Sequence, residues 1–257
     1  MTHLLAEQNG PVLFLTLNRP ESLNSFSPEM ILGLTDALKN AEANEEIKAI
    51  VLSGAGRSFS AGGDVKMMGQ VTGRQLYDHL GKLNECVITM KNLSKPVIAA
   101  VHGFAAGAAF NLALACDMII AADDSQFVMS FAQVGLISDG GGLYCLPRLI
   151  GPQRAKELFF SGEPIDAVTA SSYGIVNKTV PLAQLEDEAR SYAFRLAQGP
   201  VQAFGHMKRI MEQAFSSTLE DILEQERLTQ AMMIETADHR EGVAAFKEKR
   251  KPVFQGK

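Results

Sequence analysis

KPVIAAVHGFAAGAAFNLALACD, from Lys95 to Asp117, is the stretch that decides the fold. Its first part, KPVIAAVHG, is a short apolar run that predicts a buried strand. Its second part, AAGAAFNLALACD, consists of small and apolar residues and predicts a helix that follows the strand directly. A buried strand leading into a helix is the unit from which parallel sheets with helical crossovers are built.

The same alternation continues on both sides of this stretch. A helix is predicted from Ser27, which caps it, with Pro28 at the first helical position. A second helix is predicted over RQLYDHLGKLNECVITMKNL. Strands are predicted at PVLFLTLNRP, at KAIVLSGAG and, as a pair, in MIIAADDSQFVMS. Strands that alternate with helices predict an α/β fold with a largely parallel sheet.

The last third of the chain is predicted to be mostly helical. A Gly199-Pro200 break separates LEDEARSYAFRLAQ from two further helices. We therefore expect an α/β core over residues 1–198 and a helical region over residues 199–257. The helical region contains four methionines that could mark a binding surface, although a core or a subunit interface is favoured because methionine adapts to irregular gaps: Met207, Met211, Met232 and Met233.

Composition excludes several classes of function. The 257 residues carry a formal net charge of −5, which argues against binding to nucleic acid or to a membrane surface. The basic run KEKRK, residues 247–251, is interpreted as a solvated last helical turn. Three cysteines without CxxC spacing indicate neither a disulfide framework nor a zinc site. With no signal peptide and no apolar run long enough to cross a bilayer, a cytoplasmic location is expected.

Two stretches of very small residues are candidates for binding through main-chain groups. Ala61-Gly62-Gly63-Asp64 closes a loop after a buried strand, where small side chains let a ligand approach free N–H groups. The run from Gly103 to Ala109 crosses a strand-to-helix junction, and a helix N-terminus presents unpaired N–H donors. The alternatives are a plain turn capped by Asp64 and close packing of a helix on the sheet.

A third candidate is VGLISDGGGLYCLPRLIG, from Val134 to Gly151, where Asp139 precedes three glycines. One interpretation is a helix N-cap, with the glycines turning the chain. The other is a catalytic base whose pKa is raised by an apolar pocket. The pocket would be built from neighbouring apolar side chains: Phe131, Val134, Leu136, Ile137, Leu143 and Tyr144.

Five motifs in order along essentially the whole chain resemble the enoyl-CoA hydratase/isomerase (crotonase) superfamily. They are LNRPESLNSFSPEM, FSAGGD, HGFAAGAAFNLALACD, VGLISDGGGLYCLPRLIG with QRAKEL after it, and EGVAAFKEKRKPVF. The resemblance implies a spiral of β-β-α units with a C-terminal α-helical region that forms trimers or dimers of trimers. It also implies an acyl-CoA thioester substrate. No ligand cluster or dinucleotide motif indicates a metal or redox cofactor.

The resemblance also assigns roles to individual positions. The backbone N–H groups of Gly63 and Ala108 would bind the thioester oxygen as an oxyanion hole, with Asp64 and Gly107 beside them in the substrate-binding set. The Ala61 carbonyl would meet the adenine of CoA. The other assigned positions are Lys66, near CoA, and Phe246 and Lys249, in a tail that can reach CoA from a neighbouring subunit.

Members of the family that hydrate a double bond resemble one another in carrying two glutamates, which align here with Asn111 and Phe131. Neither can exchange a proton, so the two-glutamate mechanism is unavailable. Asn111 is expected to bind substrate or orient Asp139, or else to be a surface amide. Asp139, eight residues after Phe131, matches an aspartate of certain relatives. These relatives are the dienoyl-CoA isomerases, the phenylacetate-pathway ring-epoxide isomerases and 4-chlorobenzoyl-CoA dehalogenase. The motif around Asp139 resembles that of the phenylacetate-pathway isomerases most.

The leading hypothesis is therefore an acyl-CoA isomerase that shifts a double bond, or opens a ring epoxide, with Asp139 as its single base. Three alternatives stay open at this point. Asp139 could act as a nucleophile in dehalogenase or hydrolase chemistry. The protein could be a residual hydratase, or a CoA-ester-binding protein without catalysis.

Overall fold

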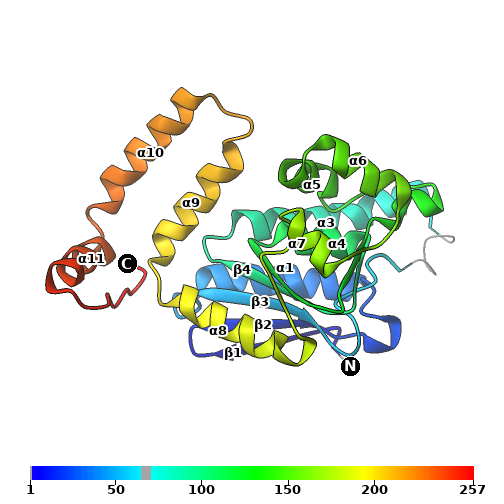
Figure 1. Ribbon diagram of the computed structural model, residues 1–257, viewed down its shortest axis with the longest axis horizontal. Helices are drawn as coiled ribbons and strands as arrows, with labels where there is room; N and C mark the ends of the chain where they lie inside the picture. The colour runs from blue at the N-terminus through cyan, green and yellow to red at the C-terminus, as the bar shows by residue number, and fades with distance from the viewer. Residues whose placement is uncertain (1, 65–70) are drawn as a thin grey trace.

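The computed structural model describes residues 2–64 and 71–257, and its main feature is a twisted sheet (Figure 1). Within the described residues this sheet has six strands in the order β1-β2-β3-β4-β6-β9. Only β1 and β2 are antiparallel; all other neighbours are parallel. The strands are β1 (Leu4–Asn9), β2 (Val12–Leu17), β3 (Ala49–Gly54), β4 (Val97–Val101), β6 (Met118–Ala122) and β9 (Lys178–Val180).

A second, smaller sheet lies beside the first. It joins β5 (Phe104–Ala106), β7 (Gln126–Val128) and β8 (Ile165–Asp166). The predicted strand pair of residues 118–130 forms as two strands, β6 and β7, but they belong to different sheets and do not pair with each other. The predicted α/β architecture with a largely parallel sheet is confirmed.

Helices cover both faces of the large sheet, which explains why its inner strands β4 and β6 are apolar throughout. In β3, Ile50 and Leu52 point into the core shared with α1 and α3, while Ala49 and Val51 face α8. The helices of the α/β part are α1 (Pro28–Ala43), α3 (Gly73–Asn92), α4 (Ala108–Ala115), α5 (Gly142–Ile150), α6 (Pro152–Ser161), α7 (Ala167–Ser172) and α8 (Leu185–Ala197).

Helix starts follow local capping rules. The Ser27 hydroxyl accepts a hydrogen bond from the Met30 N–H at 3.1 Å, and Pro28 occupies the first turn, as predicted. Thr72 and Gln75 form a reciprocal capping box at the start of α3. Three short 3₁₀ turns complete the part: η1 (Pro20–Ser22), η2 (Ser130–Val134) and η3 (Leu182–Gln184).

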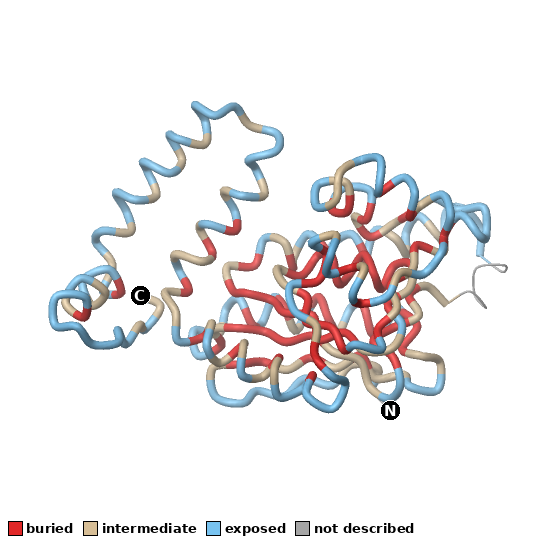
Figure 2. The backbone as a smooth tube through the Cα atoms, in the orientation of Figure 1, coloured by how far each residue is buried: buried red, intermediate tan, exposed pale blue. Residues whose placement is uncertain are grey.

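The C-terminal helices extend away from the α/β part as a mostly exposed arm (Figures 1 and 2). They are α9 (Val201–Gln213), α10 (Leu219–Met233) and α11 (Ala237–Glu248), and they follow the Gly199-Pro200 break. Helix α9 nevertheless touches the core, because Gly205 lies so close to Ser94 that a Cβ would sit 2.7 Å from its carbonyl oxygen. The division at residue 199 stays a prediction.

Candidate active site

The Ala61–Asp64 loop is held by a buried asparagine that sequence reasoning missed. Asn24 is fully buried, and its Nδ2 donates to the carbonyl oxygens of Ala55 and Ser58, each at 2.8 Å. The Ser60 hydroxyl donates to the Asn24 carbonyl at 2.7 Å. The signal available in the sequence was Asn24 itself, a polar residue in the quoted motif LNRPESLNSF. A buried asparagine is expected to have hydrogen-bond partners for its side-chain amide.

The loop then runs beside β5 and reaches the start of α4. The Ala106 N–H donates to the Ser60 carbonyl at 3.0 Å. Gly62 has a φ of +78°, and a Cβ on it would collide with the Ala106 carbonyl oxygen and lie 3.0 Å from the Ala108 nitrogen. Glycine is required here, because this close approach brings the Gly63 segment and the Ala108 segment together.

Helix α4 begins at this point with free donors. Gly107 is its N-cap, with a φ of 52°, and Ala108 is its first residue. Within residues 2–64 and 71–257, neither the Ala108 N–H nor the Gly63 N–H has a hydrogen-bond acceptor. Two free N–H groups on neighbouring segments, one at the positive end of a helix dipole, have the chemistry of an oxyanion hole. The close-packing interpretation also holds, since every residue of α4 is buried.

Asp139 lies in the loop between η2 and α5. The N-cap of α5 is Gly141, with no side-chain cap bond, so the N-cap interpretation of Asp139 is wrong. Among the described residues, the buried Oδ1 of Asp139 has no hydrogen-bond partner. Burial raises the pKa of this carboxyl from 3.8 to about 6, and a bond from its own backbone N–H opposes the rise only in part. With a pKa of about 6 and one oxygen free of hydrogen bonds to the described residues, the Asp139 carboxyl can exchange a proton near neutral pH.

Asn111 connects Asp139 to α4. It is fully buried, so the surface-amide interpretation is wrong. Its Nδ2 donates to the Ser138 hydroxyl at 2.9 Å and to the Asp139 carbonyl at 2.8 Å. Helix α4 therefore carries both the Ala108 N–H and, one turn later, the amide that contacts the main chain of Asp139.

The apolar side chains predicted to form a pocket around Asp139 are only partly buried in the single chain. Of these six side chains only Phe131 is buried, and its ring lies 3.6 Å from where a Cβ on Gly107 would be. The Tyr144 hydroxyl donates instead to the Glu212 carbonyl in α9, at 3.3 Å. The other four, all exposed in the single chain, are Val134, Leu136, Ile137 and Leu143.

The apolar cover of the Asp139 loop comes from α3, which lies about 50 residues earlier in the chain. A Cβ on Gly140 would lie 3.4 Å from Leu83, and one on Gly141 would lie 3.5 Å from Val87. The local sequence around Asp139 shows no sign of this, because the packing partner is set by the tertiary fold.

The remaining predicted site residues are divided between the loop and the arm. The Asp64 carboxylate lies 3.8 Å from Arg19 Nη1. Lys66 lies outside the described residues. Phe246 and Lys249 lie at the end of α11, on the opposite side of the molecule from α4 (Figure 1), and Phe246 is 87% exposed. The single chain does not bring this tail to the loop that contains Ala61.

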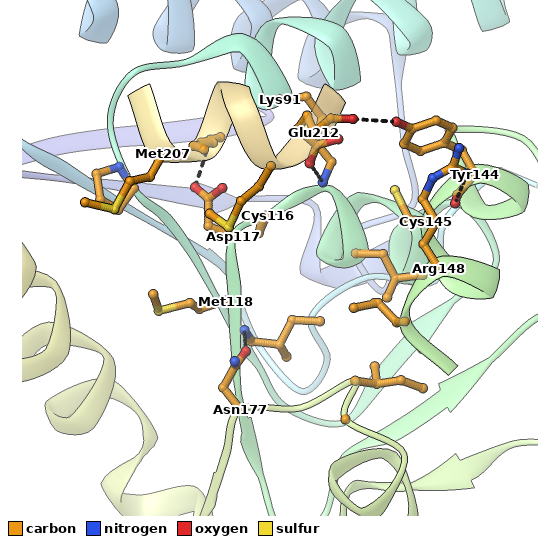
Figure 3. Close-up of a pocket in the computed structure, with 18 of the residues that line it drawn as sticks. Lys91, Cys116, Asp117, Met118, Tyr144, Cys145, Arg148, Asn177, Met207 and Glu212 are labelled. Carbon is orange, nitrogen blue, oxygen red and sulfur yellow. Dashed lines mark hydrogen bonds and ion pairs between the residues drawn. The ribbon is translucent and has the colours of Figure 1, made fainter. Parts of the chain in front are cut away.

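A separate apolar pocket lies between α9 and the α/β part, and two ion pairs span it (Figure 3). Lys208 Nζ lies 2.8 Å from Asp117 Oδ2, and Lys91 Nζ lies 2.8 Å from Glu212 Oε1. Asp117, which directly precedes β6, is therefore an anchor for α9. Elsewhere in the described residues, no three His, Cys, Asp or Glu side chains gather as metal ligands would, and no helix is long and apolar enough to cross a membrane.

Comparison with known proteins gives consistent matches. The family described as "Enoyl-CoA hydratase/isomerase" matches residues 7–257. The chain is 40% identical to 1,2-epoxyphenylacetyl-CoA isomerase of Escherichia coli (strain K12), covering 100% of both chains. It is 39% identical to a probable enoyl-CoA hydratase of Rhodobacter capsulatus, over 95% of this chain and 94% of the relative.

The fold has equally close counterparts among solved structures. A crystal structure of an enoyl-CoA hydratase from Polaromonas sp. JS666 superimposes with a TM-score of 0.95 at 36% identity, over 98% of this chain and 99% of the other. The crotonase-like fold class predicted from the motifs is confirmed.

Proposed function

The chain belongs to the enoyl-CoA hydratase/isomerase family, and we propose that this enzyme isomerises an unsaturated acyl-CoA thioester through an enolate, with Asp139 as its single base. One observation carries the proposal. Asp139 is a half-buried carboxyl with a raised pKa whose Oδ1 has no partner among the described residues, and Asn111 bonds its backbone carbonyl to the helix whose first N–H is free. At the positions where relatives that hydrate keep glutamates, this chain has Asn111 and Phe131.

In the proposed reaction the thioester oxygen accepts hydrogen bonds from the N–H groups of Gly63 and Ala108. The Asp139 carboxylate takes a proton from the carbon beside the thioester, and the electron pair of the broken C–H bond moves onto the thioester oxygen, which gives an enolate conjugated with the existing double bond. The resulting acid returns the proton to another carbon, and the double bond re-forms in its new place. Each N–H donor contributes about 3–4 kcal/mol to such a transition state. Proton transfer of this kind requires no metal or redox cofactor.

Hydration is the competing activity, because one similar protein is named a probable enoyl-CoA hydratase. Hydration needs one group to activate water and a source of a proton for carbon. Asn111 offers neither, since its Nδ2 is bonded to Ser138 and to the Asp139 carbonyl. A single carboxyl that alternates between base and acid is sufficient for isomerisation.

The name of the Escherichia coli relative suggests a ring-containing acyl group, which would lie against the Phe131 ring beside Gly107. We further propose that CoA binds along the loop from Ala61 to Asp64 and contacts Lys66, which lies outside the described residues. Completion of that site by Phe246 and Lys249 would require a neighbouring subunit, in a homotrimer or a dimer of trimers. A cytoplasmic location fits the three buried free cysteines.

The experiment compares the wild-type enzyme with Asp139→Asn, using 3-hexenoyl-CoA in deuterium oxide. We expect the wild type to form the 2-enoyl isomer and to exchange the proton beside the thioester, and the variant to lose both by at least 10³-fold. The Asp36→Asn variant, at an exposed aspartate of α1, is the matched control.

Two outcomes would overturn the proposal. Unchanged isomerisation and proton exchange in Asp139→Asn would show that Asp139 is not the base. Heavy oxygen from labelled water appearing in the Asp139 carboxylate after turnover would show a covalent ester intermediate instead of proton transfer. Incubation with crotonyl-CoA, where loss of the conjugated double bond reports hydration, measures the competing activity directly.

A further inference from the structure

Helix α4 carries two groups of the proposed site at its N-terminal end. Ala108 is the first residue of the helix, and Asn111 follows three residues later, within the first turn. The Ala108 N–H is the proposed donor to the thioester oxygen. Asn111 holds the segment that contains the proposed base, at 2.9 Å from the Ser138 hydroxyl and 2.8 Å from the Asp139 carbonyl.

We propose that Asn111 is a positioning residue, whose side-chain amide fixes the Ser138–Asp139 segment to α4 and so sets the place of the Asp139 carboxyl relative to the Ala108 N–H. The inference rests on the proposed role of Asp139 as the base. Helix α4 acts as the rigid spacer between the group that binds the oxygen and the group that moves the proton. Asn111 itself does not touch the reacting atoms.

The glycines after Asp139 close tightly around this amide. A Cβ on Gly142 would collide with Asn111 Oδ1 and lie 2.6 Å from the Ser138 hydroxyl oxygen. A Cβ on Gly140, where φ is +52°, would lie 3.6 Å from Asn111 Cβ. The three-glycine run therefore lets the loop backbone wrap the amide, which leaves the loop little freedom to shift.

The side-chain oxygen of Asn111 lowers the stability of the fold. Asn111 Oδ1 is buried and has no donor among the described residues. An unsatisfied buried acceptor costs about 1–3 kcal/mol, which an apolar side chain of the same size would avoid. The Nδ2 group explains why an amide stands there nonetheless, because only a donor can hold both the Ser138 hydroxyl and the Asp139 carbonyl.

Neutrality is the second reason for an amide. A carboxylate at position 111 would place a second negative charge beside the Asp139 loop and disfavour ionisation of the base. Burial raises the pKa of Asp139, and no charged side chain in the described part of the chain contributes to the rise. From α3, the side chains that face this loop are the apolar Leu83 and Val87.

The test uses Asn111→Leu, which keeps the size but removes the donor, and Asn111→Asp, which adds a charge. With 3-hexenoyl-CoA we expect kcat to fall about 10²-fold in both, as displacement of a catalytic group by about 1 Å can do, while KM changes less than threefold. Only Asn111→Asp should move the acidic limb of the kcat profile, by about one pH unit upward. Asn177→Asp, at an amide that accepts from the Ile119 N–H, is the control for added charge.

A readout without substrate keeps the inference testable in any case. Amide hydrogen exchange over residues 138–142 should accelerate at least tenfold in Asn111→Leu. The carboxyl carbon signal of Asp139, assigned with Asp139→Asn, should titrate at higher pH in Asn111→Asp. Thermal unfolding of both variants shows that each is folded when measured.

The outcomes separate this inference from the proposed function. If Asp139→Asn is inactive while both Asn111 variants keep the wild-type kcat, pH profile and protection of the loop from hydrogen exchange, Asn111 has no positioning role, but Asp139 is still supported as the base. If Asp139→Asn is fully active, Asp139 is not the base. A loss of thermal stability in Asn111→Leu with unchanged kcat would reduce Asn111 to a structural residue and also overturn the inference.

Discussion

Asp139 is held where its charge is unfavourable. Its folded-state pKa of about 6 lies above the ordinary value of 3.8, so the folded chain binds a proton more tightly than the unfolded chain does. The free energy of unfolding therefore decreases as pH rises from about 4 to about 6, and the full cost is present above that range. Active sites commonly retain such destabilising groups because the chemistry requires them.

The Asp139→Asn variant should accordingly be more stable than the wild type at pH 8, by on the order of 2 kcal/mol, and should lose this advantage near pH 4. Urea unfolding at the two pH values measures the difference. Asp36→Asn, at an exposed site, should show no comparable dependence. An equal stability difference at both pH values would mean that burial does not raise the pKa of Asp139.

Gly62 is the residue whose size controls the proposed oxyanion hole. Alanine at this position would need a φ of +78° and would collide with the Ala106 carbonyl oxygen. The Gly63 segment and the Ala108 segment would therefore have to separate. We expect Gly62→Ala to lower kcat by about 10²–10³-fold, the effect of losing one donor, and to lower stability by about 1–3 kcal/mol.

Steady-state kinetics and thermal unfolding measure the two effects. The control is Gly81→Ala in α3, where nothing lies within 4 Å of the new methyl group and stability should rise slightly. A Gly62→Ala variant with wild-type kcat would show that the Gly63 N–H does not serve the reaction.

At the scale of elements, α9 is fastened to the α/β part by a buried ion pair. Lys208 is 8% exposed, and its ammonium also donates to the Met90 carbonyl at 3.0 Å. The partner carboxylate of Asp117 accepts from the Val97 N–H at 2.8 Å. The arm thus begins with a helix that shares its polar contacts with α3 and β4, although the chain breaks at Gly199-Pro200.

Lys208→Met should destabilise the protein by about 3 kcal/mol, because it leaves the Asp117 charge poorly compensated. The matched variant is Lys39→Met, which removes an exposed ion pair with Glu85 and should cost less than about 1 kcal/mol. Guanidinium unfolding at one protein concentration compares the two. Equal effects would mean that the Lys208 pair does not anchor α9.

At the scale of the whole molecule, the arm exposes several large apolar side chains. Helix α10 has no buried residue, and four of its apolar side chains are 53–69% exposed: Leu219, Leu223, Leu228 and Met232. We predict that these side chains pack against a neighbouring subunit, because exposed apolar patches often mark interaction sites. This is consistent with the proposed trimer or dimer of trimers.

Light scattering should therefore give the wild type the mass of a trimer or a hexamer. The double variant Leu228→Glu with Met232→Glu should shift the mass toward the monomer, because two charges would be buried in the interface. Gln230→Glu, at an exposed polar position of the same helix, is the control. A monomeric wild type would contradict the proposed assembly.

Local patterns in the sequence determined the alternation of strands and helices, the Ser27 cap, and the small residues at Gly63 and Ala108. Each of these depends on residues close together in the chain, through periodicity, capping or the absence of a side chain. Motif resemblance pointed to Asp139, and the structure shows its Oδ1 to be buried without a hydrogen-bond partner among the described residues.

Only the tertiary structure decided which remote side chains contact the Asp139 loop. The contact of Asn111 with the Asp139 backbone joins residues 28 apart, and that of Lys208 with Asp117 joins residues 91 apart. Apolar side chains near Asp139 in the chain are mostly exposed, while Leu83 and Val87 from α3 pack against the glycines that follow it. The sequence shows which side chains are apolar and which kind of element carries them, but packing between remote elements decides which groups those side chains contact.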